Sequence, residues 1–331
     1  MITRTPHPKA PAADLEIGLP RVITYLRISV TDRCNLRCGY CMPEDQSFLD
    51  RRDLLTFEEI VNVARVLVER GVTKIRLTGG EPLVRRDLPM LVGMLKALPQ
   101  APQVVMTTNA TLLKRHARSL HDAGLDRLNI SLDTLRPATF EKLSRRQGLE
   151  ESLAGVDAAL EAGFGKTKIN TVVMGGVNDD EIPALLAYAA DRKIEQRFIE
   201  FMPLASNQYG LEAQRVPLEE IRRRVEVVGD LDALPGGAGP AKMFRLRSTG
   251  QRLGIISAIS QPFCDSCNRV RLTATGVLRS CLFEGGEVPL RDAMRGRESQ
   301  AVIGNALEFV RRVKPDVHSG LGHVQMNQVG G

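Results

Sequence analysis

The sequence contains no Trp, and aromatic residues make up only 4% of its 331 residues. Proteins that bind single-stranded nucleic acid stack successive bases on aromatic side chains. The formal net charge is +6 at pH 7, but no dense run of Lys and Arg accompanies it. The composition therefore argues against nucleic acid as a partner. It leaves an anionic small molecule or an ordinary solvated surface as the reason for the positive charge.

Long apolar runs are also missing, so we expect no membrane span. The first twenty residues are rich in Pro, Ala and Thr, include Asp14 and Glu16, and lack the apolar core of a signal peptide. We expect residues 1–20 to be a flexible leader. The expected location is the cytoplasm, where a reducing environment keeps thiolates available as ligands.

Each of two cysteine groups lacks a fourth member. The first has C-x3-C-x2-C spacing, and the second is a C-x2-C pair followed by a more distant cysteine; the residues are Cys34, Cys38 and Cys41, and Cys264, Cys267 and Cys281. A structural zinc site takes four ligands. Electron carriers complete each [4Fe–4S] cluster with four cysteines. Three cysteines on a [4Fe–4S] cluster leave one iron open, which is a place for chemistry.

Other interpretations of these cysteines remain. A disulfide framework is typical of short secreted domains and does not suit a chain of this length without a signal peptide. Zinc with a borrowed histidine is a second alternative for the first group. Zinc or a redox dithiol is the alternative for the C-x2-C pair. Because the six cysteines divide into three and three, we favour two clusters that each keep an open iron.

Strands and helices alternate regularly through the first two thirds of the chain, which predicts a parallel sheet with covering helices. The Thr56–Glu59 segment is a capping box that opens a helix ending near Gly71. The expected strands are 25–30, 74–78, 103–107, 126–131, 166–173 and 196–201. The other expected helices of this region are 87–98, 112–123, 137–146 and 150–162, with one more that begins at 178–181.

Polar or glycine-rich stretches follow these strands, and barrel-like α/β enzymes build their sites at the carboxyl ends of strands. Side chains alternate between the two faces of a strand. Arg27 therefore opposes Leu26 and Ile28, and Arg76 opposes Ile75 and Leu77. We expect the apolar face to meet the helices and the basic face to line a cavity. A charged cavity predicts an anionic ligand.

After about residue 203 the pattern changes to short strands near 243–246, 254–259 and 269–273, with a turn at Thr275-Gly276. Helices are expected at 218–225, 289–294 and 300–312. Arg269 and Arg271 lie two apart on one strand and project to one face, where their planar forks suit phosphate oxygens. No Walker A loop is present, so a nucleoside triphosphate would be held by side chains of the cavity.

Five segments together resemble one enzyme family. They are 27–35, 38–43, 74–82, 263–273 and the terminal Gly330-Gly331. With Tyr40 as the aromatic residue before the last cysteine, the first loop resembles radical S-adenosylmethionine (SAM) enzymes. The whole set resembles the GTP 3′,8-cyclase family within them, from about residue 20 to the last residue.

The resemblance implies an α/β fold, an incomplete (βα)6 TIM-type barrel with a C-terminal β-rich extension. The expected divisions are a core at 21–203, an extension at 204–317 that carries the second cluster, and a tail at 318–331. It also implies a lyase that converts GTP to (8S)-3′,8-cyclo-7,8-dihydroguanosine 5′-triphosphate, the first step of molybdenum cofactor biosynthesis. A 5′-deoxyadenosyl radical made from SAM abstracts the ribose 3′ hydrogen, and the resulting carbon radical attacks C8 of guanine.

Site residues follow from the same resemblance. The first three cysteines would hold the [4Fe–4S] cluster that cleaves SAM, and the last three a second [4Fe–4S] cluster that binds guanine. SAM contacts are expected from Tyr40, Gly80, Ser131 and Met202. GTP contacts are expected from Arg27, Lys74, Arg76, Thr107, Lys168, Arg197, Arg269, Arg271 and the backbone of Val270. Catalytic roles are expected for Arg269, Arg271, Gly330 and Gly331, since the tail of the family reaches the active site.

Expected partners are a second copy of the chain in a homodimer, an electron donor, and cyclic pyranopterin monophosphate synthase, which takes the product onward. Two other functions compete with this interpretation. A two-cluster electron carrier would need four cysteines per cluster. An RNA-modifying radical enzyme would need a basic surface or an added domain, and the sequence offers neither.

Overall fold

The computed structural model describes residues 21–202, 215–237, 239–295, 299–320 and 326–330. The expected leader at 1–20, the expected boundary at residues 203 and 204, and Gly331 lie outside the described residues. None of the helices in the described part of the chain combines the length and the apolar character that crossing a bilayer requires.

One twelve-stranded sheet organises the described residues, in the order β12-β11-β10-β1-β2-β3-β4-β5-β6-β9-β8-β7. Its first six strands pair in parallel and in sequence order, as the alternation predicted. The strands are β1 Tyr25–Ser29, β2 Lys74–Thr78, β3 Gln103–Thr108, β4 Arg127–Ser131, β5 Lys168–Val173, β6 Glu195–Glu200, β7 Leu231–Leu234, β8 Lys242–Leu246, β9 Arg252–Ile256, β10 Arg269–Leu272, β11 Val277–Arg279 and β12 Glu287–Pro289.

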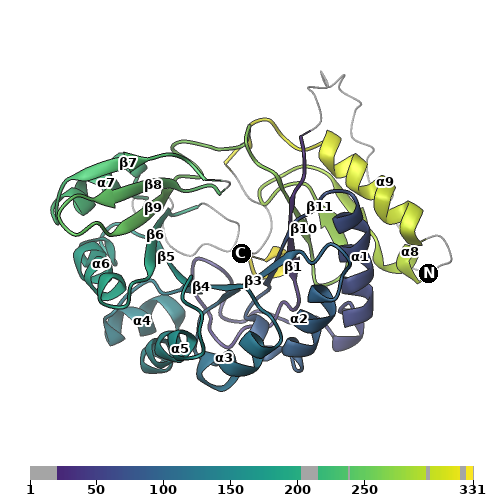
Figure 1. The fold of residues 1–331 in the computed structure, drawn as a ribbon, viewed down its shortest axis with the longest axis horizontal. Coiled ribbons are helices and arrows are strands. Elements are labelled where there is room, and N and C mark those ends of the chain that lie inside the picture. The colour runs from purple at the N-terminus through teal and green to yellow at the C-terminus, as the bar shows by residue number, and fades with distance from the viewer. Residues whose placement is uncertain (1–20, 203–214, 238, 296–298, 321–325, 331) are drawn as a thin grey trace, which may run out of the picture.

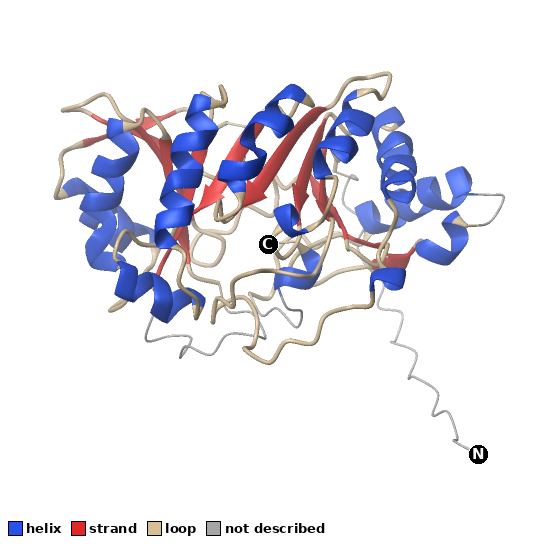
Figure 2. Ribbon diagram, turned by 90° about the horizontal axis from the view of Figure 1, so that it is seen from below, coloured by secondary structure: helices blue, strands red, loops and turns tan. Residues whose placement is uncertain are grey.

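Helices cover the outer side of the curved sheet, and the strands form an arc inside them (Figure 1). The α-helices are α1 Phe57–Glu69, α2 Leu88–Lys96, α3 Leu113–Asp122, α4 Pro137–Ser144, α5 Leu149–Glu161, α6 Ile182–Asp191, α7 Leu218–Glu226, α8 Arg291–Met294, α9 Ser299–Arg312 and α10 Met326–Val329. Three short 3-10 helices are η1 Arg51–Asp53, η2 Pro82–Val84 and η3 Asp179–Glu181. Seen from below, the helices lie in front of the strands and the long loops gather along one edge (Figure 2).

The capping box that opens α1 is present. Thr56 Oγ1 accepts the N–H of Glu59 at 3.2 Å, and Glu59 Oε2 accepts the N–H of Thr56 at 2.8 Å. These bonds satisfy two of the backbone donors that every helix N-terminus leaves without a partner. The sequence prediction of this helix start is confirmed.

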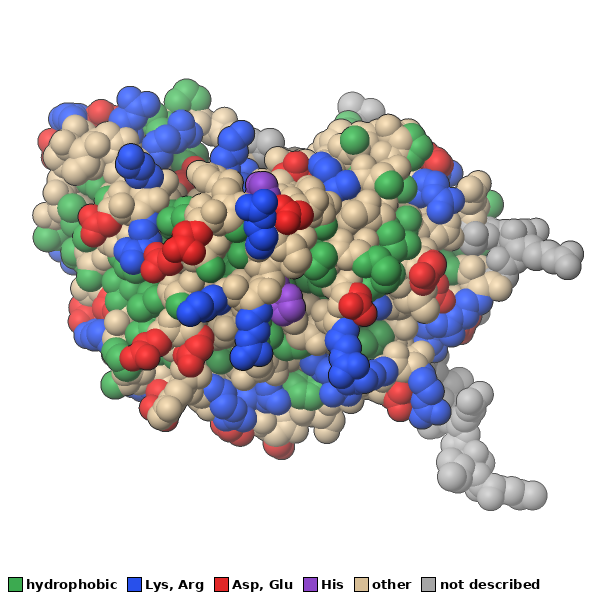
Figure 3. Space-filling model, turned by 60° about the horizontal axis from the view of Figure 1, so that its bottom comes forward, with side chains coloured by type: hydrophobic (Ala, Val, Ile, Leu, Met, Phe, Trp, Pro, Cys, Tyr) green, Lys and Arg blue, Asp and Glu red, His purple; other side chains and the backbone are tan. Residues whose placement is uncertain are grey.

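The main core lies between the sheet and its helices. Leu26, Ile28, Ile75 and Leu77 are fully buried in it, as the strand alternation predicted. Burying one such side chain stabilises the fold by about 1.5–3 kcal/mol. Because these residues face outward to the helices, their neighbours along each strand must face the inner, concave side. On the helical face in Figure 3, basic and acidic side chains are interspersed.

The C-terminal strands are not a separate β layer but extend the same sheet at both edges. Strand β10 pairs in parallel with β1, and β9 pairs in parallel with β6. The hairpins β10–β11 and β8–β9 then continue the sheet outward in antiparallel fashion. Thus residues near 270, far from residue 25 in sequence, lie directly beside it.

Candidate functional site

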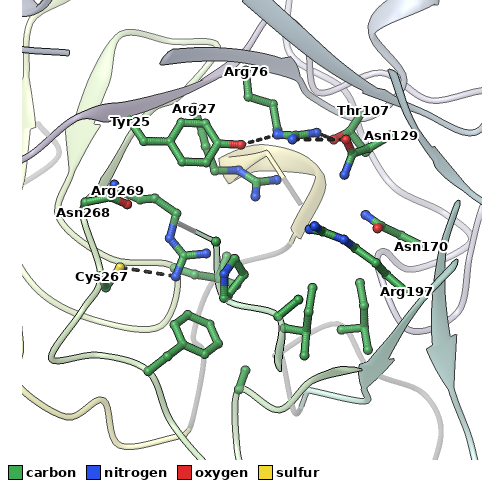
Figure 4. A pocket seen from close by; sticks show the side chains of 18 of the residues that line it. Tyr25, Arg27, Arg76, Thr107, Asn129, Asn170, Arg197, Cys267, Asn268 and Arg269 are labelled. Carbon is green, nitrogen blue, oxygen red and sulfur yellow. Dashed lines mark hydrogen bonds between the residues drawn. The ribbon is translucent and has the colours of Figure 1, made fainter. Parts of the chain in front are cut away.

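A cavity of about 720 Å³ occupies the concave side of the sheet. It is lined from β1 through β6, from β9 and β10, and from the loops that hold the second cysteine group. Side chains from opposite parts of the sheet point into this one space (Figure 4). The concave face of the sheet therefore presents side chains from along the whole length of these strands to one site, and not from their carboxyl ends alone.

Basic side chains form a row across neighbouring strands. In the sheet register Arg27 lies between Arg271 on one side and Arg76 on the other. Two unit charges at the strand spacing of about 4.8 Å repel by about 3 kcal/mol at an effective dielectric constant near 20. Burial, and next Arg271, lower the pKa of Arg27 well below its ordinary value. Such a row is stabilised when an anion binds to it.

Three side-chain hydrogen bonds hold the Arg76 side chain in place. Its Nη1 donates to Thr107 Oγ1 at 2.7 Å and its Nη2 to Asn129 Oδ1 at 3.3 Å, while its Nε donates to the Tyr25 hydroxyl (Figure 4). The side chain of Arg76 is only 5% exposed. None of these partners is a carboxylate, so they orient the guanidinium for an anionic ligand.

Tyr25 is a site residue that the sequence prediction did not include. Its ring lies 4.9 Å from the Lys74 ammonium, measured to the ring centroid. Burial raises the pKa of its hydroxyl, but Arg76, Arg27 and Lys74 outweigh burial and bring it to about 7. Tyr25 shares the face of Arg27 by strand alternation, which was the available signal. Its aromatic character alone did not point to a cluster of cations.

Glu195 is a second residue that the prediction missed. Its Oε1 accepts from Lys168 Nζ at 2.5 Å and from Arg197 Nε at 2.7 Å. Burial, followed by Arg197, lowers the pKa of Lys168 to about 8, while Glu195 acts in the opposite direction. Glu195 lies opposite Lys168 in the β5–β6 ladder. The expected strand began at residue 196, which left Glu195 outside it.

The first cysteine loop folds beside the carboxyl ends of the strands. The N–H of Arg37 donates to Ser144 O at 2.8 Å, and the N–H of Gly39 to Leu143 O at 3.1 Å, so the loop is tied to α4. Burial, with Glu81 next, raises the pKa of Cys34 to about 12, and burial also raises the pKa of Cys41 to about 12. Thiols in such a place need a cation to become thiolates.

Gly80 packs against this loop. A Cβ at Gly80 would lie 2.3 Å from Arg33 O and 2.7 Å from Asp32 O. The N–H of Gly80 donates to Thr31 O at 2.7 Å. Gly80 is not among the residues that line the cavity. Because Gly80 has no Cβ, its backbone can lie close to the backbone that precedes Cys34. From the sequence we had expected the missing Cβ to let a ligand approach Gly80.

Tyr40 connects the loop to β4 and the segment after it. Its hydroxyl donates to Asp133 Oδ2 at 2.6 Å, and Asp133 Oδ1 accepts the N–H of Val172 at 2.8 Å. Burial raises the pKa of Asp133 to about 6, and its two hydrogen bonds act in the opposite direction. Tyr40, Ser131 and Met202, the residues expected to contact SAM, all line the cavity. The residue that orients Tyr40, Asp133, was not predicted.

All three cysteines of the second group line the same cavity. Arg269 Nη2 lies 3.4 Å from Cys267 Sγ, and the Arg269 guanidinium also stacks 4.7 Å from the Phe263 ring centroid (Figure 4). Burial raises the pKa of Cys267, but Arg269 and Lys314 outweigh it and bring the pKa to about 7. The second group is therefore a more cationic site than the first.

The donor sets suit iron–sulfur clusters. Every cysteine is free of disulfides, and Cys34, Cys38 and Cys41 act on one another electrostatically, as do Cys264, Cys267 and Cys281. Among the described residues no three Cys, His, Asp or Glu side chains converge on a single point suited to one metal ion. A cluster does not require such convergence, because each thiolate binds a different iron.

The described part of the tail enters the site. Arg271 Nη1 donates to Val329 O at 3.2 Å and also to Gly330 O. Asn327 is fully buried, and its Nδ2 donates to Asp32 O at 3.1 Å. A Cβ at Gly330, whose φ is +75°, would lie 2.5 Å from Thr78 Cγ2. The tail therefore packs between β1, β2 and the first cysteine loop.

Most predicted contact residues meet at the cavity. It is lined by Tyr40, Ser131, Met202, Arg27, Lys74, Arg76, Thr107, Lys168, Arg197, Arg269 and Arg271. Gly80 and Val270 do not line the cavity, and the Gly330 carbonyl accepts a hydrogen bond from Arg271 while Gly330 packs beside Thr78. The side chain of Val270 is fully buried opposite Leu26 on the helix-facing side, and the predicted contact through its backbone stays a prediction.

Comparisons with known proteins agree on one family. The radical SAM superfamily model matches residues 28–189, and the Molybdenum Cofactor Synthesis C model matches residues 194–320. A GTP 3′,8-cyclase from Hydrogenovibrio crunogenus is 43% identical over 304 residues, which cover 90% of this chain and 92% of that protein. A GTP 3′,8-cyclase from Erythrobacter litoralis is 45% identical over 315 residues, 93% of each chain.

A solved structure shares the fold. Streptococcus suis SuiB bound to S-adenosylmethionine aligns with a TM-score of 0.54 at 21% identity. The alignment covers 62% of this chain and 47% of that one, so this chain matches less than half of SuiB. At this identity the likeness concerns the fold alone.

Proposed function

The chain belongs to the GTP 3′,8-cyclase family of the radical SAM superfamily, and on that premise we propose that it converts GTP to (8S)-3′,8-cyclo-7,8-dihydroguanosine 5′-triphosphate. This is the first step of molybdenum cofactor biosynthesis. The observation that carries the proposal is one cavity in which a row of arginines and a cationic cysteine group lie together. A nucleoside triphosphate has a polyanionic end that suits the row of arginines and a nitrogenous base that suits the second cysteine group.

The two cofactors are SAM and [4Fe–4S] clusters, one for each cysteine group. We assign Cys34, Cys38 and Cys41 to the first cluster and Cys264, Cys267 and Cys281 to the second. When bound, the first cluster supplies the electron that splits SAM into methionine and a 5′-deoxyadenosyl radical. Tyr40, Ser131 and Met202 line the cavity on the side of the first loop and would hold SAM there.

The basic row would bind the triphosphate. Arg27 and Arg76 lie side by side in this row, and three hydrogen bonds to Tyr25, Thr107 and Asn129 already orient Arg76. Lys168 and Arg197 share Glu195, so phosphate would compete with that carboxylate for them. Holding the triphosphate at several points fixes the ribose, which is what selective abstraction of one hydrogen atom requires.

Arg271 joins the tail to the substrate side of the cavity. Its guanidinium contacts the carbonyls of Val329 and Gly330 while its neighbours in the sheet face the cavity. The proposed catalytic role of Gly330 therefore acts through Arg271. Gly331 keeps the role that the family resemblance implies.

The reaction implies partners beyond the chain. We propose a homodimer, an external electron donor for SAM cleavage, and a transfer of product to cyclic pyranopterin monophosphate synthase. Free thiols at six positions support a reducing cytoplasmic location. Light scattering of the reconstituted protein tests the dimer, because a monomeric mass in the presence of GTP and SAM would contradict it.

The deciding experiment identifies the product. Anaerobically reconstituted protein is incubated with SAM, a strong reductant and either GTP or ATP, and the products are analysed by mass spectrometry and NMR. We expect the cyclised nucleotide from GTP and 5′-deoxyadenosine in equal amount. Equal turnover of ATP, or 5′-deoxyadenosine without nucleotide consumption, would refute the assignment.

Iron content tests the two clusters separately. The wild-type protein should hold about eight irons per chain, and replacing either cysteine group by Ala should leave about four. Replacing Arg269 and Arg271 by Ala should abolish cyclisation while SAM still binds. Arg312, which is exposed at the end of α9, is the matched control for loss of one Arg. Full activity of the double variant would contradict the role of these arginines.

A further inference from the structure

Lys314 is a buried lysine that neither the sequence prediction nor the proposed mechanism uses. It follows the end of α9 and is only 7% exposed. Its Nζ donates to Arg269 O at 2.7 Å and to Ser280 O at 2.5 Å. A lysine is rarely buried unless its charge has partners. The role of the Lys314 side chain follows from where these two carbonyl acceptors lie in the chain.

Both acceptors adjoin cysteines of the second group. Arg269 lies two residues after Cys267, and Ser280 immediately precedes Cys281. The two carbonyls lie on either side of the β10–β11 hairpin, where Arg271 pairs with Arg279. A single ammonium therefore connects the chain segments that present two of the three thiols.

The Lys314 segment is itself anchored. Arg21 Nη1 donates to Pro315 O at 2.9 Å, and Arg21 forms an ion pair with Asp316. Lys314 also lines the same cavity as the three cysteines of the second group. It thus has a fixed place beside the thiols, unlike the charge of an exposed lysine.

The surroundings of the two cysteine groups differ in sign. Two carboxyl groups lie near the first group: Glu81 Oε2 accepts the N–H of Asn109, whose Nδ2 is 3.9 Å from Cys34 Sγ, and Asp133 Oδ2 accepts from Tyr40. Two cations lie near the second group: Arg269 Nη2 is 3.4 Å from Cys267 Sγ, and Lys314 Nζ donates to the carbonyls of Arg269 and Ser280. A positive charge beside a cluster favours its reduced form, because reduction adds an electron.

From this arrangement we infer that Lys314 is a positioning residue for the second cluster, which holds Cys267 and Cys281 in register and raises the reduction potential of that cluster. The carbonyls of Arg269 and Ser280 accept hydrogen bonds from Lys314 Nζ, and such bonds favour the charged ammonium. The inference rests on the proposed binding of the second cluster by Cys264, Cys267 and Cys281.

The experiment is a redox titration of full-length reconstituted protein followed by EPR, with the two signals assigned by Cys34→Ala and Cys267→Ala. Four variants are compared: Lys314→Met, Lys314→Gln, Lys314→Arg and Arg312→Met. The Met variant removes the charge at nearly constant volume, and the Gln variant removes it while retaining an N–H donor. Arg312→Met removes a charge two residues away on the exposed surface, where solvent screens it.

We expect the midpoint potential of the second cluster to become more negative in Lys314→Met and Lys314→Gln. It should stay near the wild-type value in Lys314→Arg and Arg312→Met, and the first cluster should not change in any variant. Unchanged potentials in both uncharged variants with full iron content would overturn the inference, as would equal shifts of both clusters.

Two further outcomes are distinguishable. Loss of four irons in both uncharged variants, with retention in Lys314→Arg, would establish the positioning role directly. If the wild-type protein itself holds only about four irons, the proposed second cluster fails and the inference about Lys314 fails with it.

Discussion

Gly80→Ala is a sharp test of how the first cysteine loop is positioned. The new methyl group would lie 2.3 Å from Arg33 O, 2.6 Å from Arg33 C and 2.7 Å from Asp32 O. All three atoms belong to the backbone that leads into Cys34, so no flexible side chain can move aside. Either the loop shifts or the strand end does.

The size of the effect follows from the packing. Forcing one methyl group into a close-packed place destabilises a protein by about 1–3 kcal/mol. For a chain of 331 residues, the usual unfolding entropy per residue converts this to a decrease in Tm of roughly 1–4 °C. The more specific effect is on the cluster: we expect the variant to lose the iron of the first cluster and to retain about four irons at the second.

Two other glycines provide matched controls. Gly93→Ala lies in helix α2, where nothing is within 4 Å of the added Cβ, so it should be neutral or stabilising by up to about 1 kcal/mol. Gly163→Ala, between α5 and β5, would force a side chain onto a φ of +100° and meet His121 Nε2 at 3.0 Å, away from both cysteine groups. It should lower Tm without loss of iron.

The assays are thermal unfolding of the apoprotein by circular dichroism and iron analysis after anaerobic reconstitution. A Gly80→Ala protein with wild-type Tm and about eight irons would refute the argument that Gly80 acts through loop packing. Equal iron loss in Gly163→Ala would show that any destabilisation releases the cluster, which would also refute the argument.

Three further predictions concern the cavity and the fold. Tyr25→Phe removes the acceptor of Arg76 Nε and should raise KM for GTP about tenfold or more, because a hydrogen bond to a charged group contributes about 1.5–3 kcal/mol. SAM binding, measured by equilibrium dialysis, should not change, and an unaltered KM for GTP would contradict the prediction. The pKa values of Lys74 and Lys168 are lowered to about 8, so affinity for GTP should decrease as pH rises above about 8. Between about pH 8 and 10 the unfolded chain binds more protons than the folded one, so this contribution to stability should increase with pH in chemical unfolding; opposite trends would show that these lysines do not carry the effect. Thr56→Ala should lower the free energy of unfolding by about 1 kcal/mol while cyclisation is unchanged, because it removes the cap of α1 alone.

The alternation of side chains along the strands predicted many of the residues that line the site. The side-chain period of a strand is two, so once β1 and β2 were identified, Arg27 and Arg76 had to share the face opposite Leu26 and Ile75. The cysteine spacing likewise identified the first group, because its three cysteines lie in one short loop, and it identified the Cys264–Cys267 pair of the second. These parts of the site are local in sequence.

Other parts depend on contacts between distant segments. The pairing of β10 with β1 brings Arg271 beside Arg27, and short strands near the C-terminus can join a sheet at either edge or pack as a separate layer. Glu195 shares its carboxylate between two cations because of the β5–β6 register. Gly80 was expected to approach a ligand, and in the structure it packs against the backbone of Arg33. The sequence cannot distinguish these two contacts, because either one requires a residue without a Cβ.

By itself, then, the sequence determined the kinds of chemistry present: two incomplete cysteine groups, a basic strand face and a helix-covered parallel sheet. Only the tertiary structure decided which groups lie close together, and whether the charges beside each cysteine group are positive or negative. It brought Glu81 and Asp133 to the first cysteine group and Arg269 and Lys314 to the second. The physical reason is that charge interactions depend on distance through space, whereas a sequence specifies distance only along the chain.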